Sequence, residues 1–231
     1  MTRTVAVIQA RLGSRRFPGK MLADLGGRPL IEWVVERTRR SRLVDRVVVA
    51  TTDETLDDRL VAECGRLGVD VRRGSTADVL RRFSTAIADD SADTVVRICA
   101  DNPFVDPDCI DHVIGEFRSR GVGYAYNHRP FGDCNYADGF GAEVVERALL
   151  DRLNESQLSS EHREHVTLAL ADGTVDVSRH GCAAPPGLAR PELGFDVDEP
   201  GDLDRLRALV RLGGLTIGSS AGDIIVAADM P

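Results

Sequence analysis

The sequence has few cysteines, no long apolar run and no excess of positive charge. Its 231 residues include five cysteines, an odd number without a CxxC pair, which argues against a disulfide framework and against a cysteine-held zinc site. No apolar run approaches the roughly 18 residues of a membrane helix, and no signal-like segment opens the chain. These absences predict a soluble, cytoplasmic protein with reduced thiols and no membrane partner.

The charge balance also limits the class of partner. The formal net charge is −8, whereas proteins that bind nucleic acid as their main partner present a broad positive surface to the phosphates. Basic residues instead gather near the start of the chain, where Arg11, Arg15, Arg16 and Lys20 fall close together. The length suits one domain, and we expect residues 1–231 to form it.

The basic segment, IQARLGSRRFPGKML (residues 8–22), joins a predicted strand to a predicted helix. The strand, residues 4–9, is β-branched, and the apolar residues of positions 29–38 recur at helical spacing. In an open α/β sheet such a crossover lies where ligands bind. Gly13 and Gly19 allow close backbone approach, and the cations suit phosphate. The segment therefore predicts a phosphate-binding loop, with a solvated basic turn as the alternative.

Two common phosphate motifs do not fit this segment. Five residues separate Gly13 from Gly19, and Met21 follows Lys20, whereas the P-loop has four residues between its glycines and Ser or Thr after its lysine. No GxGxxG follows the first strand either, which argues against a dinucleotide-binding site.

Strand and helix patterns alternate through the first half of the chain. Strands are predicted at residues 46–52, 69–73 and 94–100, followed by helices at 56–67, 77–88 and 107–118. Ser75 or Thr76 is the expected N-cap of the second of these helices. Four βα units predict an α/β, Rossmann-like, mainly parallel, doubly wound sheet.

The alternation breaks after Gly121. Over about residues 121–150 we expect a small antiparallel excursion, with strands at residues 124–128 and 142–145. The later elements are predicted as helices at residues 146–153, 160–170 (N-cap Ser160) and 200–212, and as strands at residues 175–180 and 193–197. The apolar run at residues 224–227 is a last strand or a partner contact.

Two aspartates directly follow predicted strands. Asp101 comes after residues 94–100 and Asp198 after residues 193–197, which places both at the sheet edge that carries the basic loop. Mg²⁺ is commonly held by one or two carboxylates together with phosphate oxygens. The alternatives are a turn aspartate at position 101 and a helix N-cap at position 198.

Taken together, these segments resemble a known family. The chain is similar, from Val5 to about Leu206, to the cytidylyltransferases related to spore coat polysaccharide biosynthesis protein F, cousins of the CMP-KDO and CMP-sialic acid synthetases. The opening loop resembles the family's IQAR-x-GS-x-R-x-PGK-x-L. The other matching segments are GSTADVLRRF (residues 74–83), VRICADNP (96–103), REHVT (163–167) and VDEPGDL (197–203).

The resemblance implies the nucleotide-diphospho-sugar transferase type of fold and Mg²⁺-dependent transfer of CMP from CTP to a sugar acid or related acceptor, with release of pyrophosphate, in glycan or secondary-metabolite biosynthesis. It also implies a homodimer that forms through the excursion between Gly121 and Leu150, where the acceptor would bind as well. By resemblance, the catalytic residues are Lys20, Arg11 and Asp101. The nucleotide is bound by Ala10, Arg11, Gly13, Ser14, Arg16, Lys20 and Arg82, and Mg²⁺ by Asp101 and Asp198.

The acceptor side of the pattern matches less closely. The implied acceptor-binding residues are Asn127, Tyr136, Asp138, Glu143, Arg163 and His165, but Ala137 stands where the family has proline and Gly141 where it has aspartate. We therefore expect an unusual acceptor. Packing or capping is the alternative role for Arg163 and His165. The alternative functions are a nucleotidyltransferase for a sugar phosphate or phosphonate, and a non-catalytic nucleotide-binding protein.

Overall fold

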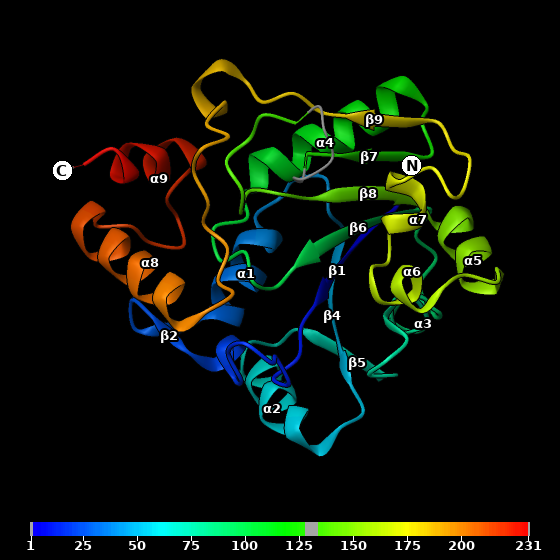
Figure 1. Cartoon of the computed structure of the whole chain (residues 1–231), viewed down its shortest axis with the longest axis horizontal. Helices are drawn as coiled ribbons and strands as arrows, with labels where there is room; N and C mark the ends of the chain where they lie inside the picture. Colours follow the sequence, from blue (N-terminus) through cyan, green and yellow to red (C-terminus); the bar gives the residue numbers. More distant parts are fainter. Residues whose placement is uncertain (1, 128–133, 231) are drawn as a thin grey trace.

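A seven-stranded sheet organises the chain (Figure 1). The computed structural model describes residues 2–127 and 134–230. The strand order is β5–β4–β1–β6–β8–β7–β9, and β8 runs antiparallel to both of its neighbours. The strands are β1 (Thr4–Gln9), β4 (Arg46–Thr52), β5 (Asp70–Gly74), β6 (Thr94–Cys99), β7 (Tyr124–Tyr126), β8 (Glu143–Glu146) and β9 (Arg179–Gly181), and a separate hairpin joins β2 (Asp24–Leu25) to β3 (Arg28–Pro29).

Helices cover both faces of the sheet because its central strands are apolar on both sides. Along β1, Ala6 and Ile8 face one core cluster while Val5 and Val7 face another, as the two-residue period of a strand requires. The first face carries α1 (Leu30–Arg39), α2 (Asp58–Arg66) and α4 (Pro107–Arg120), and the second carries α3 (Val79–Ala86), α5 (Arg147–Glu155) and α7 (Leu168–Ala171). The predicted α/β, doubly wound architecture with an antiparallel excursion is confirmed.

A third apolar cluster joins the end of the chain to α1. Helices α8 (Pro200–Gly213) and α9 (Ala221–Ala228) lie together beside α1 (Figure 1). The ring of Phe104 packs edge-on against Trp33 and Phe195, with centroids 5.7 and 5.8 Å apart. Such contacts favour one fixed arrangement of the rings. Phe195 therefore anchors the segment that leads to α8.

A buried arginine fixes the turn that follows β6. Arg37 is 0% exposed, and its Nε donates to Val105 O at 2.7 Å while its Nη1 donates to Ser219 O at 2.6 Å. Asp106 pairs with the guanidinium at 3.3 Å. Burial lowers the pKa of Arg37 to about 10, so the group is still charged at neutral pH. The turn after β6 is thus tied to the segment between α8 and α9.

Two predicted elements of the second half are wrong. Residues 160–170 are not one helix, because His165 leaves helical geometry (φ −106°, ψ 87°) and separates α6 (Ser160–Glu164) from α7. Ser159, not Ser160, caps α6 by accepting from His162 N. Residues 193–197 form no ladder, since the N–H groups of Phe195 and Val197 donate to carbonyls of loops, and the only bridge found there joins Asp138 to Gly194.

Four other elements also differ from the prediction, one in its type and three at their ends. Residues 224–227 belong to helix α9, not to a strand, because Ser220 and Asp223 form a reciprocal capping box. The N-cap of α3 is Asp78, whose carboxylate accepts from Arg81 N. Strand β9 (Arg179–Gly181) is shorter and later than residues 175–180. Strand β7 ends at Tyr126, and position 128 lies outside the described residues.

Within the described ranges, no helix combines the length and the apolar character needed to cross a membrane.

Candidate active site

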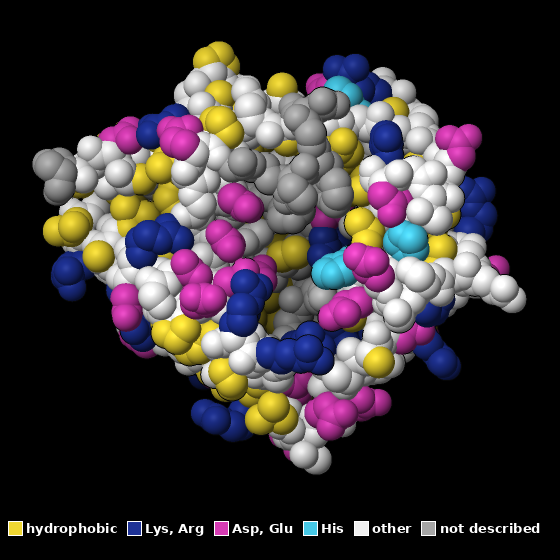
Figure 2. Space-filling model, viewed as in Figure 1, with side chains coloured by type: hydrophobic (Ala, Val, Ile, Leu, Met, Phe, Trp, Pro, Cys, Tyr) yellow, Lys and Arg dark blue, Asp and Glu magenta, His cyan; other side chains and the backbone are white. Residues whose placement is uncertain are grey.

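The basic loop and both acidic turns meet at the carboxyl ends of the parallel strands. We define the crevice as the space bounded by the loop after β1 (residues 10–19), the turn after β6 (residues 100–105) and the segment at residues 193–198. Figure 2 shows a hollow near the middle of this face, with acidic side chains along one side and Lys or Arg side chains below it. This is the edge at which open α/β sheets bind ligands.

Lys20 lies at the centre of the acidic side of the crevice. It follows Gly19, whose φ of 77° is left-handed and favours glycine. Its ammonium donates to Val197 O at 2.6 Å and contacts Asp198 Oδ1 at 3.3 Å and Asp101 Oδ2 at 3.4 Å. The side chain is only 9% exposed. One buried cation thus joins the turn after β6 to the segment at residues 193–198, which is far from it in sequence.

The two carboxylates fit a magnesium ion that arrives with a nucleotide. Asp101 and Asp198 converge on one ammonium, and their side chains are 36% and 30% exposed. Within residues 2–127 and 134–230, no group of three or more acidic, histidine or cysteine side chains is arranged to hold a metal. Mg²⁺ needs only one or two carboxylates when phosphates and waters complete its shell. The donor set suits that ion and does not form an all-protein metal cage.

Further acidic groups surround this pair. Asp138 lies beside the segment at residues 193–198, since its N–H donates to Leu193 O and its carbonyl accepts from Phe195 N, both at 2.9 Å. Burial raises the pKa of Asp196, and the charges of Asp138, Asp198 and Asp101 raise it further. This side of the crevice therefore favours cations.

The neck of the basic loop is held by a buried aspartate that the sequence analysis missed. Asp57 is 1% exposed, and its Oδ1 accepts from Leu12 N at 2.7 Å. Gly19 N donates to Leu12 O at 2.9 Å and closes the loop, while Ala10 N donates to Ala50 O at 3.2 Å. The loop is therefore shaped by the protein itself. Asp57 carried no sequence signal, because it lies in a polar stretch among several aspartates.

The tip of the loop brings two of its cations into contact with acids. Arg16 pairs with Asp198 at 2.7 Å, and Arg11 pairs with Glu164 of α6 at 4.0 Å. Ser14 Oγ accepts from Phe17 N at 3.4 Å, while Gly13 is exposed. Each of these side chains lies at the mouth of the crevice and is partly open to solvent.

Arg82 is a buried cation with unused donors. It is 1% exposed, and its Nη1 donates to Ser75 O at 2.6 Å. Its Nε and Nη2 are buried without a hydrogen-bond partner in the described part of the chain. Burial lowers the pKa of Arg82, and the nearby charge of Arg11 lowers it further. An anion between the two guanidinium groups would satisfy the free donors and relieve their repulsion.

Most of the predicted acceptor-binding residues are engaged by the protein. Asn127 Oδ1 accepts from Ala142 N at 2.7 Å. Glu143 is 2% exposed and accepts from Tyr124 OH at 2.6 Å, from Thr167 and from Arg97. The ring of Tyr136 is buried at 1% exposure. Asp138, beside the acidic pair, is partly open.

Arg163 and His165 have different surroundings at the end of α6. Arg163 Nε donates to Asp78 Oδ2 at 2.7 Å, and its Nη2 donates to Asn154 Oδ1 at 3.2 Å. These contacts tie α6 to α3 and α5. His165 is exposed at the end of α6. The acceptor roles of both residues stay predictions.

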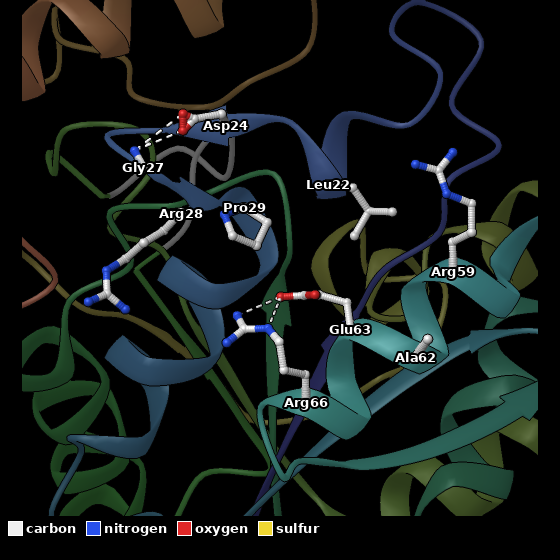
Figure 3. Close-up of a pocket in the computed structure, with 9 residues that line it drawn as sticks. All are labelled: Leu22, Asp24, Gly27, Arg28, Pro29, Arg59, Ala62, Glu63 and Arg66. Carbon is white, nitrogen blue, oxygen red and sulfur yellow. Dashed lines mark hydrogen bonds and ion pairs between the residues drawn. The ribbon is translucent and has the colours of Figure 1, made fainter.

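An open cavity of about 660 Å³ lies outside the crevice, between the β2–β3 hairpin and α2. Figure 3 shows Arg66 and Glu63 facing each other there, at 2.7 Å, with Arg28 and Arg59 on opposite sides. None of the predicted site residues lines it. Lys20 and its two carboxylates converge in the crevice and not in this cavity, so the crevice is the candidate active site.

Comparison with known proteins agrees with this geometry. A sequence model of the family described as "Cytidylyltransferase" matches residues 5–165. The chain is 34% identical over 225 residues to the spore coat polysaccharide biosynthesis protein SpsF of Bacillus subtilis, covering 95% of this chain and 91% of that protein. It is 33% identical over 249 residues to a 3-deoxy-manno-octulosonate cytidylyltransferase of Anaeromyxobacter, covering 92% and 100%. A solved cytidylyltransferase structure from Leptospira borgpetersenii superposes with a TM-score of 0.89 at 26% identity, covering 98% and 93% of the two chains.

Proposed function

The chain belongs to the cytidylyltransferase family, and from that membership we propose that it transfers CMP from CTP to a small anionic acceptor with release of pyrophosphate, using Mg²⁺ held by Asp101 and Asp198. The observation that carries this proposal is the convergence of both carboxylates on Lys20 beside a basic loop. Such an arrangement offers cations and a metal site to one triphosphate.

The chemistry needs charge neutralisation more than a protein nucleophile. An acceptor oxyanion forms a bond to the α-phosphorus, the bond from that phosphorus to the bridging oxygen breaks, and pyrophosphate leaves with the electron pair. When bound, Mg²⁺ supplies Lewis-acid neutralisation of the phosphate oxygens. Arg11, Arg16, Lys20 and Arg82 supply donors to the same phosphates, while Asp57 keeps the loop in shape.

We propose a sugar acid as the acceptor. One relative is named for the sugar acid 3-deoxy-manno-octulosonate and another for polysaccharide biosynthesis. The two alternatives are a sugar phosphate or phosphonate acceptor, and a nucleotide-binding protein without turnover.

The direct test is a pyrophosphate-release screen that crosses CTP, UTP, ATP and GTP with sugar acids, sugar phosphates and phosphonates in the presence of Mg²⁺. We expect release with CTP and a sugar acid. Chelation with EDTA should lower the rate by about 100-fold or more, and excess Mg²⁺ should restore it. If a folded protein that binds CTP releases no pyrophosphate with any pair of substrates, the non-catalytic alternative is favoured. Activity that EDTA does not lower would exclude a requirement for Mg²⁺.

Replacement of Arg163 by Gln should destabilise the fold and spare the chemistry. The variant loses charged hydrogen bonds to Asp78 and Asn154, which join α6 to α3 and α5. Because the Arg163 and Asp78 side chains are 23% and 25% exposed, we expect a loss of about 1–2 kcal/mol in the free energy of unfolding. Urea unfolding measures this loss, and steady-state kinetics should show the acceptor KM within about twofold of wild type. A tenfold rise in acceptor KM at unchanged stability would instead restore the predicted acceptor role.

A further inference from the structure

The sheet surface under the crevice becomes polar toward the strand ends. On the face covered by α3, α5 and α7, Val7 of β1 and Val95 of β6 pack in the apolar core. Two residues further along each strand, on the same face, stand Gln9 and Arg97. Asp101 follows β6 in the same direction. A polar patch thus begins where the core ends and leads toward the proposed metal site.

The strand register brings the two side chains close. In the parallel ladder of β1 and β6, Gln9 pairs with Cys99 and Val7 pairs with Arg97. Gln9 and Arg97 are therefore on adjacent strands, offset by two residues. Strand spacing and rise place their Cα atoms about 8 Å apart. Two long side chains at that separation can contact one small molecule.

Each of these side chains has a buried polar atom without a partner. Arg97 Nε and Gln9 Oε1 are both buried, and neither has a hydrogen bond within the described ranges. An unpaired buried group costs about 1–3 kcal/mol, so such atoms are uncommon in native structures. One is a donor and the other an acceptor. A ligand that offers an anionic oxygen and a hydroxyl would satisfy both.

The orientation of Arg97 is fixed from its other side. Arg97 lies directly opposite Glu143 in the β6–β8 ladder, and its Nη1 donates to that carboxylate. Glu143 is held in turn by Tyr124 OH at 2.6 Å and by Thr167. The Arg97 side chain is 12% exposed. Glu143 therefore fixes the position of the guanidinium through Nη1, which leaves Nε to donate to a bound ligand.

Resting on the proposed function, we infer that Gln9 and Arg97 form the floor of the acceptor site, where Arg97 donates to a carboxylate or phosphate oxygen and Gln9 accepts from a hydroxyl. The acceptor is thus an anionic, hydroxylated small molecule. Neither residue was predicted to bind it.

Two other arginines near the crevice are less suited to this role. Arg163 is engaged by Asp78 and Asn154. Arg82 has free donors, but the charge that lowers its pKa, after burial, is that of Arg11 in the basic loop. The unused donors of Arg82 therefore suit the triphosphate, and those of Arg97 suit the second substrate.

Steady-state kinetics of Arg97→Lys and Gln9→Leu test the inference. Lysine keeps a positive charge beside Glu143, so the fold should be retained, but it lacks the planar fork. We expect the acceptor KM to rise about tenfold or more for Arg97→Lys and about threefold for Gln9→Leu, with the CTP KM within about twofold of wild type. The matched control is Arg46→Lys, because Arg46 also pairs with a buried aspartate, Asp90 at 2.8 Å, but at the start of β4, away from the crevice. It should leave both KM values unchanged.

The acceptors should include a sugar acid, a sugar phosphate and a neutral sugar of the same size, so that the bound anion is identified. Arg97→Lys should reduce the preference for the anionic acceptor over the neutral one. A raised CTP KM with an unchanged acceptor KM would assign Arg97 to the nucleotide, and two unchanged KM values would make the floor purely structural; either result overturns the inference. If wild type turns over no acceptor, the proposed function fails. Calorimetric binding of the same acceptors then tests the floor separately, and equal binding by wild type and Arg97→Lys would overturn it.

Discussion

Replacement of Asp101 by Asn should lower kcat for pyrophosphate release by about 10³-fold while CTP still binds. Asparagine has the shape of aspartate, and the backbone bond from Val197 N to Asp101 O at 2.9 Å does not depend on the side chain. The fold is therefore retained. What is lost is one of two negative charges beside Lys20. If Asp101 holds Mg²⁺, its charge acts mainly in the transition state, when negative charge develops on the phosphates.

The measurement compares kcat at saturating CTP and Mg²⁺ with the calorimetric Kd of CTP. Asp70→Asn is the matched control, because Asp70 also pairs with a cationic side chain, that of Arg46 at 2.6 Å, at the far end of the sheet. It should leave kcat unchanged. Turnover by Asp101→Asn at the wild-type rate would remove this carboxylate from the metal site.

Replacement of Lys20 by Met should lower kcat/KM for CTP by about 100-fold or more. Methionine matches the length of the lysine stem but carries no charge. The ammonium contacts Val197 O, Asp101 and Asp198, so its loss leaves two carboxylates facing each other and removes a cation from the phosphates. Since the side chain is 9% exposed, little water can replace it.

Initial rates at varied CTP measure this loss. Lys20→Arg is the informative companion variant, because it keeps the charge but must fit a larger planar group beside Val197 O. It should recover only part of the activity. Wild-type kcat/KM in Lys20→Met would mean that the loop shapes the crevice without contacting the substrate.

The regular part of the fold could be predicted because its signals are local. Strands β1 and β4 match residues 4–9 and 46–52, since β-branched runs bounded by polar residues specify buried strands. The apolar run at residues 224–227 was predicted as a last strand or a partner contact, because a short apolar run does not by itself distinguish a buried strand from a buried helix. Only the capping box of Ser220 and Asp223 distinguishes a helix there.

The site could be predicted only in part. Lys20, Asp101 and Asp198 follow predicted elements at one sheet edge, and the structure brings them together. Residues 193–197 do not form the predicted strand. The N–H of Val197 nevertheless donates to Asp101 O, so Asp198 is still held on the same side of the crevice as Asp101. The partners of Arg163 and Arg97 depend on which helices and strands are neighbours. That information is tertiary, and no local pattern carries it.

Lys20 is also the only lysine in the sequence. An amine-reactive reagent therefore finds one side chain on this chain, besides any free amino terminus, and that side chain is shielded by Val197 and two aspartates. The rate of acylation or reductive methylation at Lys20 consequently reports how often the crevice opens. A single isotope-labelled methyl group introduced there gives one spectroscopic signal from the centre of the site. Acetylation of a lysine side chain of this protein in a cell would likewise modify Lys20 and remove its positive charge.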